Sequence, residues 1–332
     1  MPALQETGAR PERRAGGGDI VGMSLAGRSF LSVTDLSKEE IEEVWRVAGA
    51  QKSGEISAEE QLAVARGRTL AMIFDKSSLR TRLGFEVAMA QLGGHALYLA
   101  PGDARIGERE PVRDVARVLG RTVDAIAARL HPHAHIEELA AESGVPVINA
   151  MSGREHPCQA LADLLTVQEH KGELSQVELA WVGDGFNVCN SLVLICALFG
   201  VRLRVATPAT YEPLAEIVAK AEELAKESGA TITLTNDPAE AVKGADVIYT
   251  DVWISAGMED QATRRRVDFR GFQVNSALVK RAKPDAIVLH CLPAHRGEEI
   301  GDEVLDGPQC AAFDQAENRL HTQRALLTLI FG

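Results

Sequence analysis

The sequence predicts an α/β protein of two doubly wound parallel-sheet domains, with the active site in the interdomain cleft. Short apolar runs of strand length alternate with amphipathic segments of helix length, which is typical of βαβ units and parallel sheets. At 332 residues, the chain is long for one compact core and fits two domains. Polar clusters follow the ends of the apolar runs, where an open α/β sheet binds its ligands.

The first series of elements predicts one sheet. A capping box, Ser37 with Glu40, opens a helix that includes Ile41 and Trp45, and a weaker segment over 51–68 is either helix or loop. The strands are expected at 69–74, 95–99, 124–129 and 145–150. The helices between them are expected at 79–92, 112–119 and 136–140, the first of them ended by Gly93 and Gly94.

A helix over 160–169 leads into a second series, which predicts the second sheet. Its strands are expected at 177–182, 202–206, 231–234, 246–250 and 286–290. Its helices are expected from 187 to 199, from about 212 to 228 and from about 315 to 330. The predicted division of the chain is 1–22, 23–150, 151–312 and 313–332.

Residues 1–22 are expected to lie outside the fold. They contain Gly16 to Gly18, scattered charges and little apolar content, and they lack the apolar region of a secretory signal. Three arginines suggest a transit peptide, but three acidic residues speak against one. The segment is predicted to be a disordered tail, or the product of a start codon upstream of a usual start at Met23.

Composition excludes several functional classes. A net charge of −12 argues against general binding of nucleic acid or of a membrane surface. The longest apolar run, 192–199, is too short to cross a membrane. Five cysteines without C-x-x-C spacing predict neither a disulfide framework nor a zinc site, which fits a reducing compartment and a cytoplasmic location. His131, His133 and His135 are interpreted as surface residues and not as a metal site.

The loop between the strand at 69–74 and the helix at 79–92 predicts a phosphate site. Helix N-termini carry unpaired N–H groups and partial positive charge, so they favour anions. Ser77, Ser78 and Thr81 add hydroxyl donors, and Arg80 adds a guanidinium fork that suits a phosphate dianion.

Further polar clusters follow other predicted strands. Arg129 closes one strand, and His156 with Gln159 lies between a strand and the next helix. Asn187 lies in the glycine-rich turn after the strand at 177–182. The remaining clusters are Asp251 to Gly257 and His290 to Pro293. Turn chemistry alone does not account for so many clusters at strand ends.

The order of the motifs resembles the ornithine carbamoyltransferases. The motifs are Ser-x-Arg-Thr-Arg, His-Pro-x-Gln-x-Leu-Ala-Asp, Gly-Asp-Gly-x-Asn, Asp-Val-Trp-x-Ser-x-Gly, His-Cys-Leu-Pro and Phe-Asp-Gln-Ala-Glu-Asn-Arg. No single motif is specific, but the ordered set from about Met23 to the C-terminus is. The resemblance implies a carbamoyl-phosphate-binding domain over 23–150, an ornithine-binding domain over 151–312, and a C-terminal helix over 313–332 that packs back on the first domain.

The resemblance also implies an activity and its residues. The expected reaction converts carbamoyl phosphate and L-ornithine into L-citrulline and phosphate, in arginine biosynthesis. The residues matched to carbamoyl phosphate are Ser78, Leu79, Arg80, Thr81, Arg105, Arg129, His156, Gln159, Cys291, Leu292 and Arg319. Those matched to ornithine are Asn187, Asp251, Ser255 and Ala256. Those expected to be catalytic are Arg129, His156, Asp251 and Cys291.

The implied mechanism needs no metal or organic cofactor. A neutral amine attacks the carbamoyl carbon while arginines stabilise the oxygens that gain charge, and a protonated or hydrogen-bond-donating His156 serves the carbonyl. Asp251 and Cys291 hold ornithine, and the sequence leaves open which group accepts the amine proton. The family further implies a homotrimer, or an assembly of trimers, with shared active sites.

Three positions depart from the family pattern. Leu79 stands where many members carry Thr, which removes one hydroxyl from the phosphate site but keeps the backbone N–H. Arg105 lies in the loop from which a neighbouring subunit usually contributes Gln. Ala256 replaces the Met of the ornithine loop and leaves the side-chain pocket less defined.

Three alternatives stay open at this point. A sister carbamoyltransferase would use putrescine or an acylated ornithine. An NAD-dependent dehydrogenase would suit two doubly wound domains, but the pattern that starts at Gly183 and Gly185 has Val188 at its third glycine position. A non-catalytic anion sensor could dispense with His156 and Cys291, which are both present. Catalysis is therefore favoured.

Overall fold

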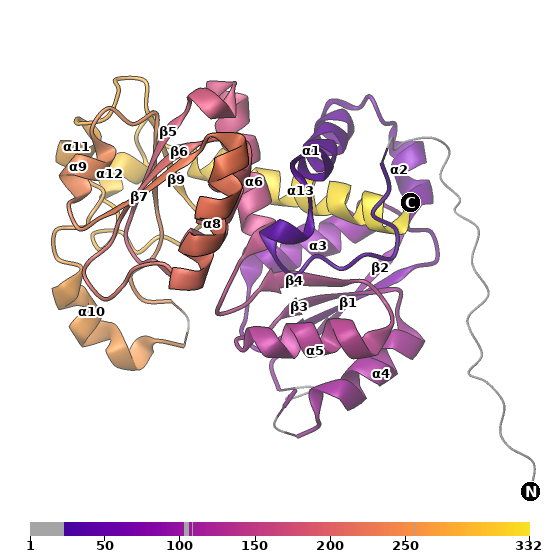
Figure 1. Ribbon diagram of the computed structural model, residues 1–332. Helices are drawn as coiled ribbons and strands as arrows, with labels where there is room; N and C mark the ends of the chain where they lie inside the picture. Colours follow the sequence, from indigo (N-terminus) through magenta and orange to yellow (C-terminus); the bar gives the residue numbers. More distant parts are fainter. Residues whose placement is uncertain (1–22, 103–105, 108, 256) are drawn as a thin grey trace, which may run out of the picture.

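The computed structural model describes residues 23–102, 106–107, 109–255 and 257–332. It consists of two α/β lobes that lie side by side, as the sequence predicts (Figure 1). Within the described residues, no helix is both long and apolar enough to span a membrane. The predictions for the tail over 1–22, for Arg105 and for Ala256 fall outside the described residues.

The first lobe is built on a four-stranded parallel sheet in the order β2-β1-β3-β4. The strands are β1 (Thr69–Phe74), β2 (His95–Leu99), β3 (Ala125–Arg129) and β4 (Val147–Met151). The helices are α1 (Lys38–Ser53), α2 (Ala58–Val64), α3 (Leu79–Gln91), α4 (Val112–Thr122) and α5 (His133–Ser143). Side chains of β1 alternate between two apolar clusters, with Met72 in one and Ile73 in the other, because both faces of the sheet are covered by helices.

The second lobe is built on a five-stranded parallel sheet in the order β7-β6-β5-β8-β9. The strands are β5 (Glu178–Val182), β6 (Arg202–Ala206), β7 (Thr231–Thr235), β8 (Val247–Thr250) and β9 (Ile287–His290). The helices are α7 (Asn187–Phe199), α8 (Ala215–Ser228), α9 (Pro238–Val242), α10 (Ala262–Asp268), α11 (Ser276–Val279) and α12 (Asp302–Leu305). The lobe has helices on both sides of its sheet (Figure 1), which confirms the doubly wound prediction.

Two long helices connect the lobes. They are α6 (Pro157–Lys171) and α13 (Ala312–Phe331), which pack on each other. The yellow α13 continues from the second lobe onto α1 and α3 of the first (Figure 1). There the buried Arg324 donates from Nε to Gln51 Oε1 at 3.1 Å and from Nη1 to Gln91 Oε1 at 2.6 Å. A side chain near the C-terminus thus joins two helices of the first lobe.

The predicted long elements are present, with shifts at their ends. The capping box of Ser37 and Glu40 opens α1, and a second box, formed by Ser57 and Glu60, makes the uncertain segment a helix. The helix expected from residue 160 begins at Pro157, since proline suits the first turn. The elements without a prediction are η1 (Val33–Asp35), η2 (Leu174–Gln176), η3 (Glu259–Gln261), α9, α10, α11 and α12. They are too short to show helical periodicity.

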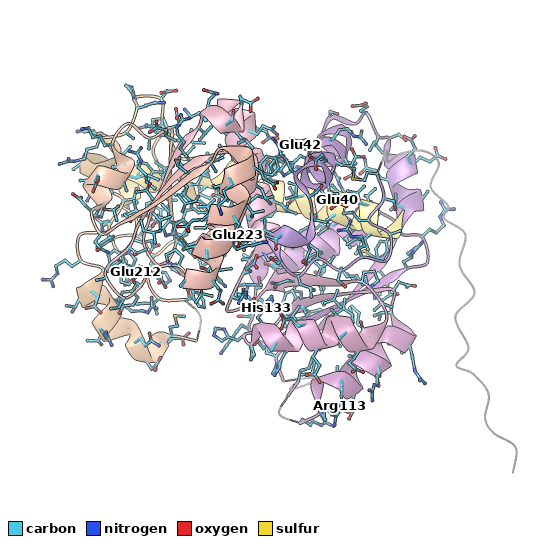
Figure 2. All side chains as sticks on the ribbon, viewed as in Figure 1. Glu40, Glu42, Arg113, His133, Glu212 and Glu223 are labelled. Atoms are coloured by element: carbon cyan, nitrogen blue, oxygen red, sulfur yellow. The ribbon has the colours of Figure 1, made fainter. Side chains whose placement is uncertain are left out.

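The histidines near α5 are only partly at the surface. His131 is exposed, but the ring of His133 is half-buried and its Nδ1 lies 2.9 Å from Ser152 Oγ. His133 lies at the end of α5 that faces the second lobe (Figure 2). Neither possible metal-binding group among the described residues includes these histidines.

Candidate active site

A cavity of about 1120 Å³ lies between the lobes. On the side of the first lobe it is lined by the loop after β1, the start of α3 and Arg129 at the end of β3. On the other side it is lined by the residues that follow β5, β8 and β9. The carboxyl ends of the two sheets therefore meet at one cavity, which is where parallel sheets bind ligands.

The structure brings together every described residue that the sequence places in the site. The predicted residues that line the cavity are Ser78, Leu79, Arg80, Thr81, Arg129, His156, Gln159, Asn187, Asp251, Ser255, Cys291, Leu292 and Arg319. Their roles remain predictions. Lining residues that the sequence analysis did not select include Tyr98, Glu259, Arg266 and His295, and they lack a motif that could have identified them.

Hydroxyl groups at the N-cap and in the first turn of α3 accept hydrogen bonds from arginines in distant parts of the chain. Arg129 Nη1 donates to Ser78 Oγ at 3.2 Å, and Arg319 Nη2 donates to Thr81 Oγ1 at 3.0 Å. Ser78 is the N-cap residue of α3, but the described contacts include no cap bond from its side chain. The Ser78 hydroxyl thus accepts from a guanidinium group and does not cap the helix.

Arg80, Arg129 and Arg319 form a cationic cluster on this wall. Burial lowers the pKa of all three, that of Arg129 to about 10, with Arg319 as the next cause. All three remain cationic near neutral pH. The Nε atoms of Arg129 and Arg319 are buried without a hydrogen-bond partner among the described residues. A multiply charged anion would relieve the repulsion between these cations and occupy their free donors.

His156 is a neutral imidazole beside these cations. It is the N-cap residue of α6, and its backbone N donates to Ser191 Oγ at 2.9 Å. Burial lowers its pKa well below the ordinary value, and Arg319, Arg129 and Arg80 lower it further. Of the two forms that the sequence left open, burial and the neighbouring arginines favour the neutral one, because a fourth cation is unfavourable in this buried cluster. A neutral ring can still donate one hydrogen bond to a carbonyl oxygen.

Gln159 is held between Arg319 and a buried carboxylate. Its Oε1 accepts from Arg319 Nη1, and its Nε2 donates to Asp163 Oδ1 at 2.7 Å. Asp163 also accepts from Tyr249 Oη at 3.0 Å and from Gln315 Nε2 at 2.6 Å. Burial raises the pKa of Asp163 to about 6. Asp163 is not among the predicted site residues, although it is the last residue of the His-Pro-x-Gln-x-Leu-Ala-Asp motif.

The opposite wall carries an acid and a thiol. Cys291 Sγ donates to Asp251 Oδ1 at 2.9 Å, and the backbone N of Val252 donates to the same oxygen at 2.7 Å. Burial raises the pKa of Asp251 above its usual value, and burial with the nearby Asp251 raises that of the Cys291 thiol well above 9. The thiol is therefore neutral and donates to the acid, so the pair can hydrogen-bond to an amine but offers no thiolate for attack.

Asn187 and the loop with Ser255 complete this wall. Asn187 Nδ2 donates to the Ser152 carbonyl at 2.6 Å. The loop is tied to the turn before Asn187 by Arg265, whose Nη1 donates to Asp184 Oδ2 at 2.6 Å and to the Trp253 carbonyl at 2.7 Å. This buried ion pair was not predicted, because Arg265 lies on the short helix α10, far from Asp184 in the sequence.

The second lobe does not fit a dinucleotide. A Cβ atom at Gly185 would lie 2.4 Å from the Tyr211 carbonyl oxygen and from the Pro213 nitrogen. This glycine therefore allows close packing of the chain on itself, whereas a dinucleotide turn uses its second glycine to approach a pyrophosphate. The Asp251, His290 and Cys291 ligand atoms lie within 4.8 Å of one another, and Cys291 Sγ donates its hydrogen to Asp251 Oδ1.

Two protein-family models match the chain. Residues 28–169 match "Aspartate/ornithine carbamoyltransferase, carbamoyl-P binding domain", and residues 175–330 match "Aspartate/ornithine carbamoyltransferase, Asp/Orn binding domain".

Similar proteins cover almost the whole chain. A protein of Carboxydothermus hydrogenoformans named ornithine carbamoyltransferase is 50% identical over 93% of this chain and 99% of its own length. A protein of Pyrococcus furiosus named "Ornithine carbamoyltransferase, anabolic" is 51% identical over 93% of this chain and 98% of its own. The solved structure of ornithine carbamoyltransferase from Pyrococcus furiosus has a TM-score of 0.89, with 51% identity over 93% of this chain and 99% of that one.

Proposed function

Because the chain belongs to the aspartate/ornithine carbamoyltransferase family, we propose that its cavity transfers a carbamoyl group from carbamoyl phosphate to the δ-amine of L-ornithine. The products are L-citrulline and phosphate. The observation that carries this proposal is the opposition of two walls in one cavity. One wall has three arginines, Arg80, Arg129 and Arg319, which can bind an anion. The other has an acidic side chain and a neutral thiol, which can bind an amine.

Carbamoyl phosphate is proposed to bind on the first wall. Arg80, the N-terminus of α3 and the loop hydroxyls face its phosphate, and Arg129 and Arg319 reach oxygens of both the phosphate and the carbamoyl group. The neutral His156 donates to the carbamoyl carbonyl oxygen. This interaction strengthens as the oxygen gains negative charge, so it stabilises the transition state more than the bound substrate.

Ornithine is proposed to bind on the second wall, with Asn187, Asp251 and Ser255 around its α-amino and α-carboxylate groups. The neutral δ-amine attacks the carbamoyl carbon, a C–N bond forms and the C–O bond to phosphate breaks. Phosphate leaves with the electron pair of the broken bond, and the proton that the amine loses is carried by this phosphate in the products. The main contribution of the protein is the orientation of two bound substrates and stabilisation of charge on oxygen.

The direct test is the formation of citrulline by the purified protein. We expect L-ornithine to be carbamoylated in clear preference to putrescine, N-acetylornithine and aspartate. Preference for one of the other amines would keep the carbamoyl chemistry but contradict the ornithine assignment at the loop that contains Ser255. Absence of turnover with every amine, in a folded protein that binds carbamoyl phosphate, would contradict the proposal and favour an anion sensor.

Arg319→Ala tests the assigned role of the cationic wall. We expect kcat/KM for carbamoyl phosphate to fall by about 100-fold or more, because the buried guanidinium faces oxygens that gain charge. Arg113→Ala is the matched control, since this exposed arginine lies on α4 outside the cavity (Figure 2). Equal activity of the two variants would contradict the assignment of Arg319 to the site.

We further propose a cytoplasmic enzyme of arginine biosynthesis that assembles as a homotrimer or as a set of trimers. A relative named anabolic supports the direction. The resemblance supports the assembly, and large apolar side chains exposed on α3 and β2, Leu79, Leu83 and Leu97, are consistent with a covered surface. Sedimentation equilibrium at micromolar concentration tests the assembly, and a monomer would contradict it.

A further inference from the structure

Glu155 is a buried acidic residue directly before His156, and it does not line the cavity. It is 1% exposed. Its Oε2 accepts from the backbone N of Val33 at 3.1 Å and from Ser191 Oγ at 3.3 Å. Burial of a carboxyl group costs free energy unless hydrogen bonds replace those it made with water, and these two bonds do so at Glu155. The contacts of Glu155 lead to His156.

Ser191 links Glu155 to the backbone of His156. Its hydroxyl is fully buried on α7, donates to Glu155 and accepts from the His156 backbone N at 2.9 Å. Because Pro157 follows, the next residue has no backbone N–H that could share this task. The hydroxyl can accept this bond in a fixed orientation only if its own hydrogen points elsewhere, and Glu155 provides the acceptor.

The ring of His156 depends on this backbone support. Its buried Nδ1 has no hydrogen-bond partner among the described residues, so the ring is not held by a bond of that atom. The same face of α7 also binds the turn that precedes His156. Asn187 Nδ2 donates to the Ser152 carbonyl at 2.6 Å, and Asn190 Nδ2 donates to the Arg154 carbonyl at 2.8 Å. Residues three and four positions apart on a helix share a face, so Asn187, Asn190 and Ser191 act together on one turn.

We propose that Glu155 and Ser191 are positioning residues that fix His156 at the carbamoyl carbonyl, through the chain Val33 N–H, Glu155 carboxylate, Ser191 hydroxyl and His156 N–H. The role of His156 in this inference rests on the proposed function. A donor that stabilises a developing charge must be held within about 0.5 Å of its productive position. The inference extends the active site to a carboxylate outside the cavity and to the N-terminal segment that contains Val33.

The kinetic test compares variants that remove or keep the chain of hydrogen bonds. Glu155→Ala and Ser191→Ala should each lower kcat about tenfold and change KM for carbamoyl phosphate by less than about twofold, since the position of a transition-state contact changes. Glu155→Gln keeps an acceptor oxygen and should stay within about twofold of the wild type. The double variant should be no slower than Ser191→Ala alone, because Glu155 acts through Ser191.

The second readout is NMR of the protein labelled with ¹⁵N-histidine. The ring signals of His156, assigned by comparison with His156→Gln, should shift in Glu155→Ala and Ser191→Ala and return in Glu155→Gln. The control is Asn275→Ala, which removes the N-cap of α11 and so lowers stability outside the site. It should keep both kcat and the His156 signals.

Two results would overturn the positioning role. One is a folded Ser191→Ala variant with wild-type kcat and unshifted His156 signals, even if Glu155→Ala fails to fold. The other is a loss of activity in Asn275→Ala as large as that in Ser191→Ala at equal loss of thermal stability. A wild-type protein that makes no citrulline would instead contradict the proposed function, and the NMR comparison would still test the positioning of the ring.

Discussion

Protonation states of individual cavity residues restrict the chemistry of the site. Arg80, Arg129 and Arg319 keep their charge, whereas burial and these neighbours keep His156 neutral. The thiol of Cys291 is also neutral. The site therefore contains fixed cations for an anionic substrate, a neutral donor for a carbonyl and no preformed thiolate nucleophile. These properties favour group transfer by orientation and charge stabilisation over covalent catalysis.

The neutral state of His156 predicts a specific effect of pH on stability. Its pKa is lowered in the folded protein, so the unfolded chain binds more protons below about pH 6.5, the unfolded value for histidine. The contribution of His156 to the free energy of unfolding is thus fully present above that pH. It is lost as the pH falls, by at most about 1.4 kcal/mol per pH unit.

Urea unfolding of the wild type and of His156→Gln at pH 7.5, 6.5 and 5.5 measures this effect. The wild type should lose more stability than the variant as the pH falls, and the difference between the two isolates His156 from the buried carboxyl groups. Parallel loss in both proteins would show that His156 carries no lowered pKa.

At the scale of elements, close contacts between helices depend on individual glycines. Gly120 on α4 allows α4 to approach α5, since a Cβ atom there would lie 1.7 Å from the Ser143 carbonyl oxygen. The clash involves backbone, so a rotamer change cannot relieve it. Gly49 on α1 is exposed, and an added Cβ atom would meet nothing within 4 Å among the described residues.

These two positions predict opposite effects of the same substitution. Gly120→Ala should lower the free energy of unfolding by about 1–3 kcal/mol, because the two helices must separate. Gly49→Ala should raise it by about 0.5–1 kcal/mol, since alanine has the higher helix propensity. Urea denaturation of both variants beside the wild type checks the pair. Destabilisation by Gly49→Ala, or none by Gly120→Ala, would contradict this account of helix packing.

At the scale of the whole molecule, one apolar cluster extends through both lobes. It includes Phe74 and Phe85 of the first lobe and Trp181 of the second. Trp45 on α1 packs against Phe199 on α7, with 4.7 Å between ring centroids. Together with α6 and α13, this shared core couples the two sheets and holds the two walls of the cavity relative to each other.

The shared core predicts that the lobes unfold together. At one fixed protein concentration, calorimetry should show a single transition, and far-UV and near-UV circular dichroism should report the same midpoint. Arg324→Ala removes the link from α13 to α1 and α3. It should lower the free energy of unfolding by about 1–3 kcal/mol and leave a single transition. Two resolved transitions in the wild type would contradict the coupling.

Much of this architecture could be predicted from local pattern. Apolar periodicity located the long elements, and the boxes at Ser37 and at Ser57 mark helix starts, since capping depends on residues only three positions apart. The carboxyl ends of parallel strands share one edge of a sheet, so polar residues after strands were expected to meet. The cavity brings them together. The ordered motifs determined the family, and the identity to its members agrees.

Other features of this protein were decided only by its tertiary structure. Arg319 donates to Thr81 across 238 positions of sequence, and Arg265 reaches Asp184 across 81. The neutral state of His156, and its link through Ser191 to Glu155, arise from burial and from neighbours on separate helices. Periodicity and capping report on neighbours within a few residues, whereas desolvation and Coulomb interactions depend on distances that exist only once both lobes have folded around the cavity.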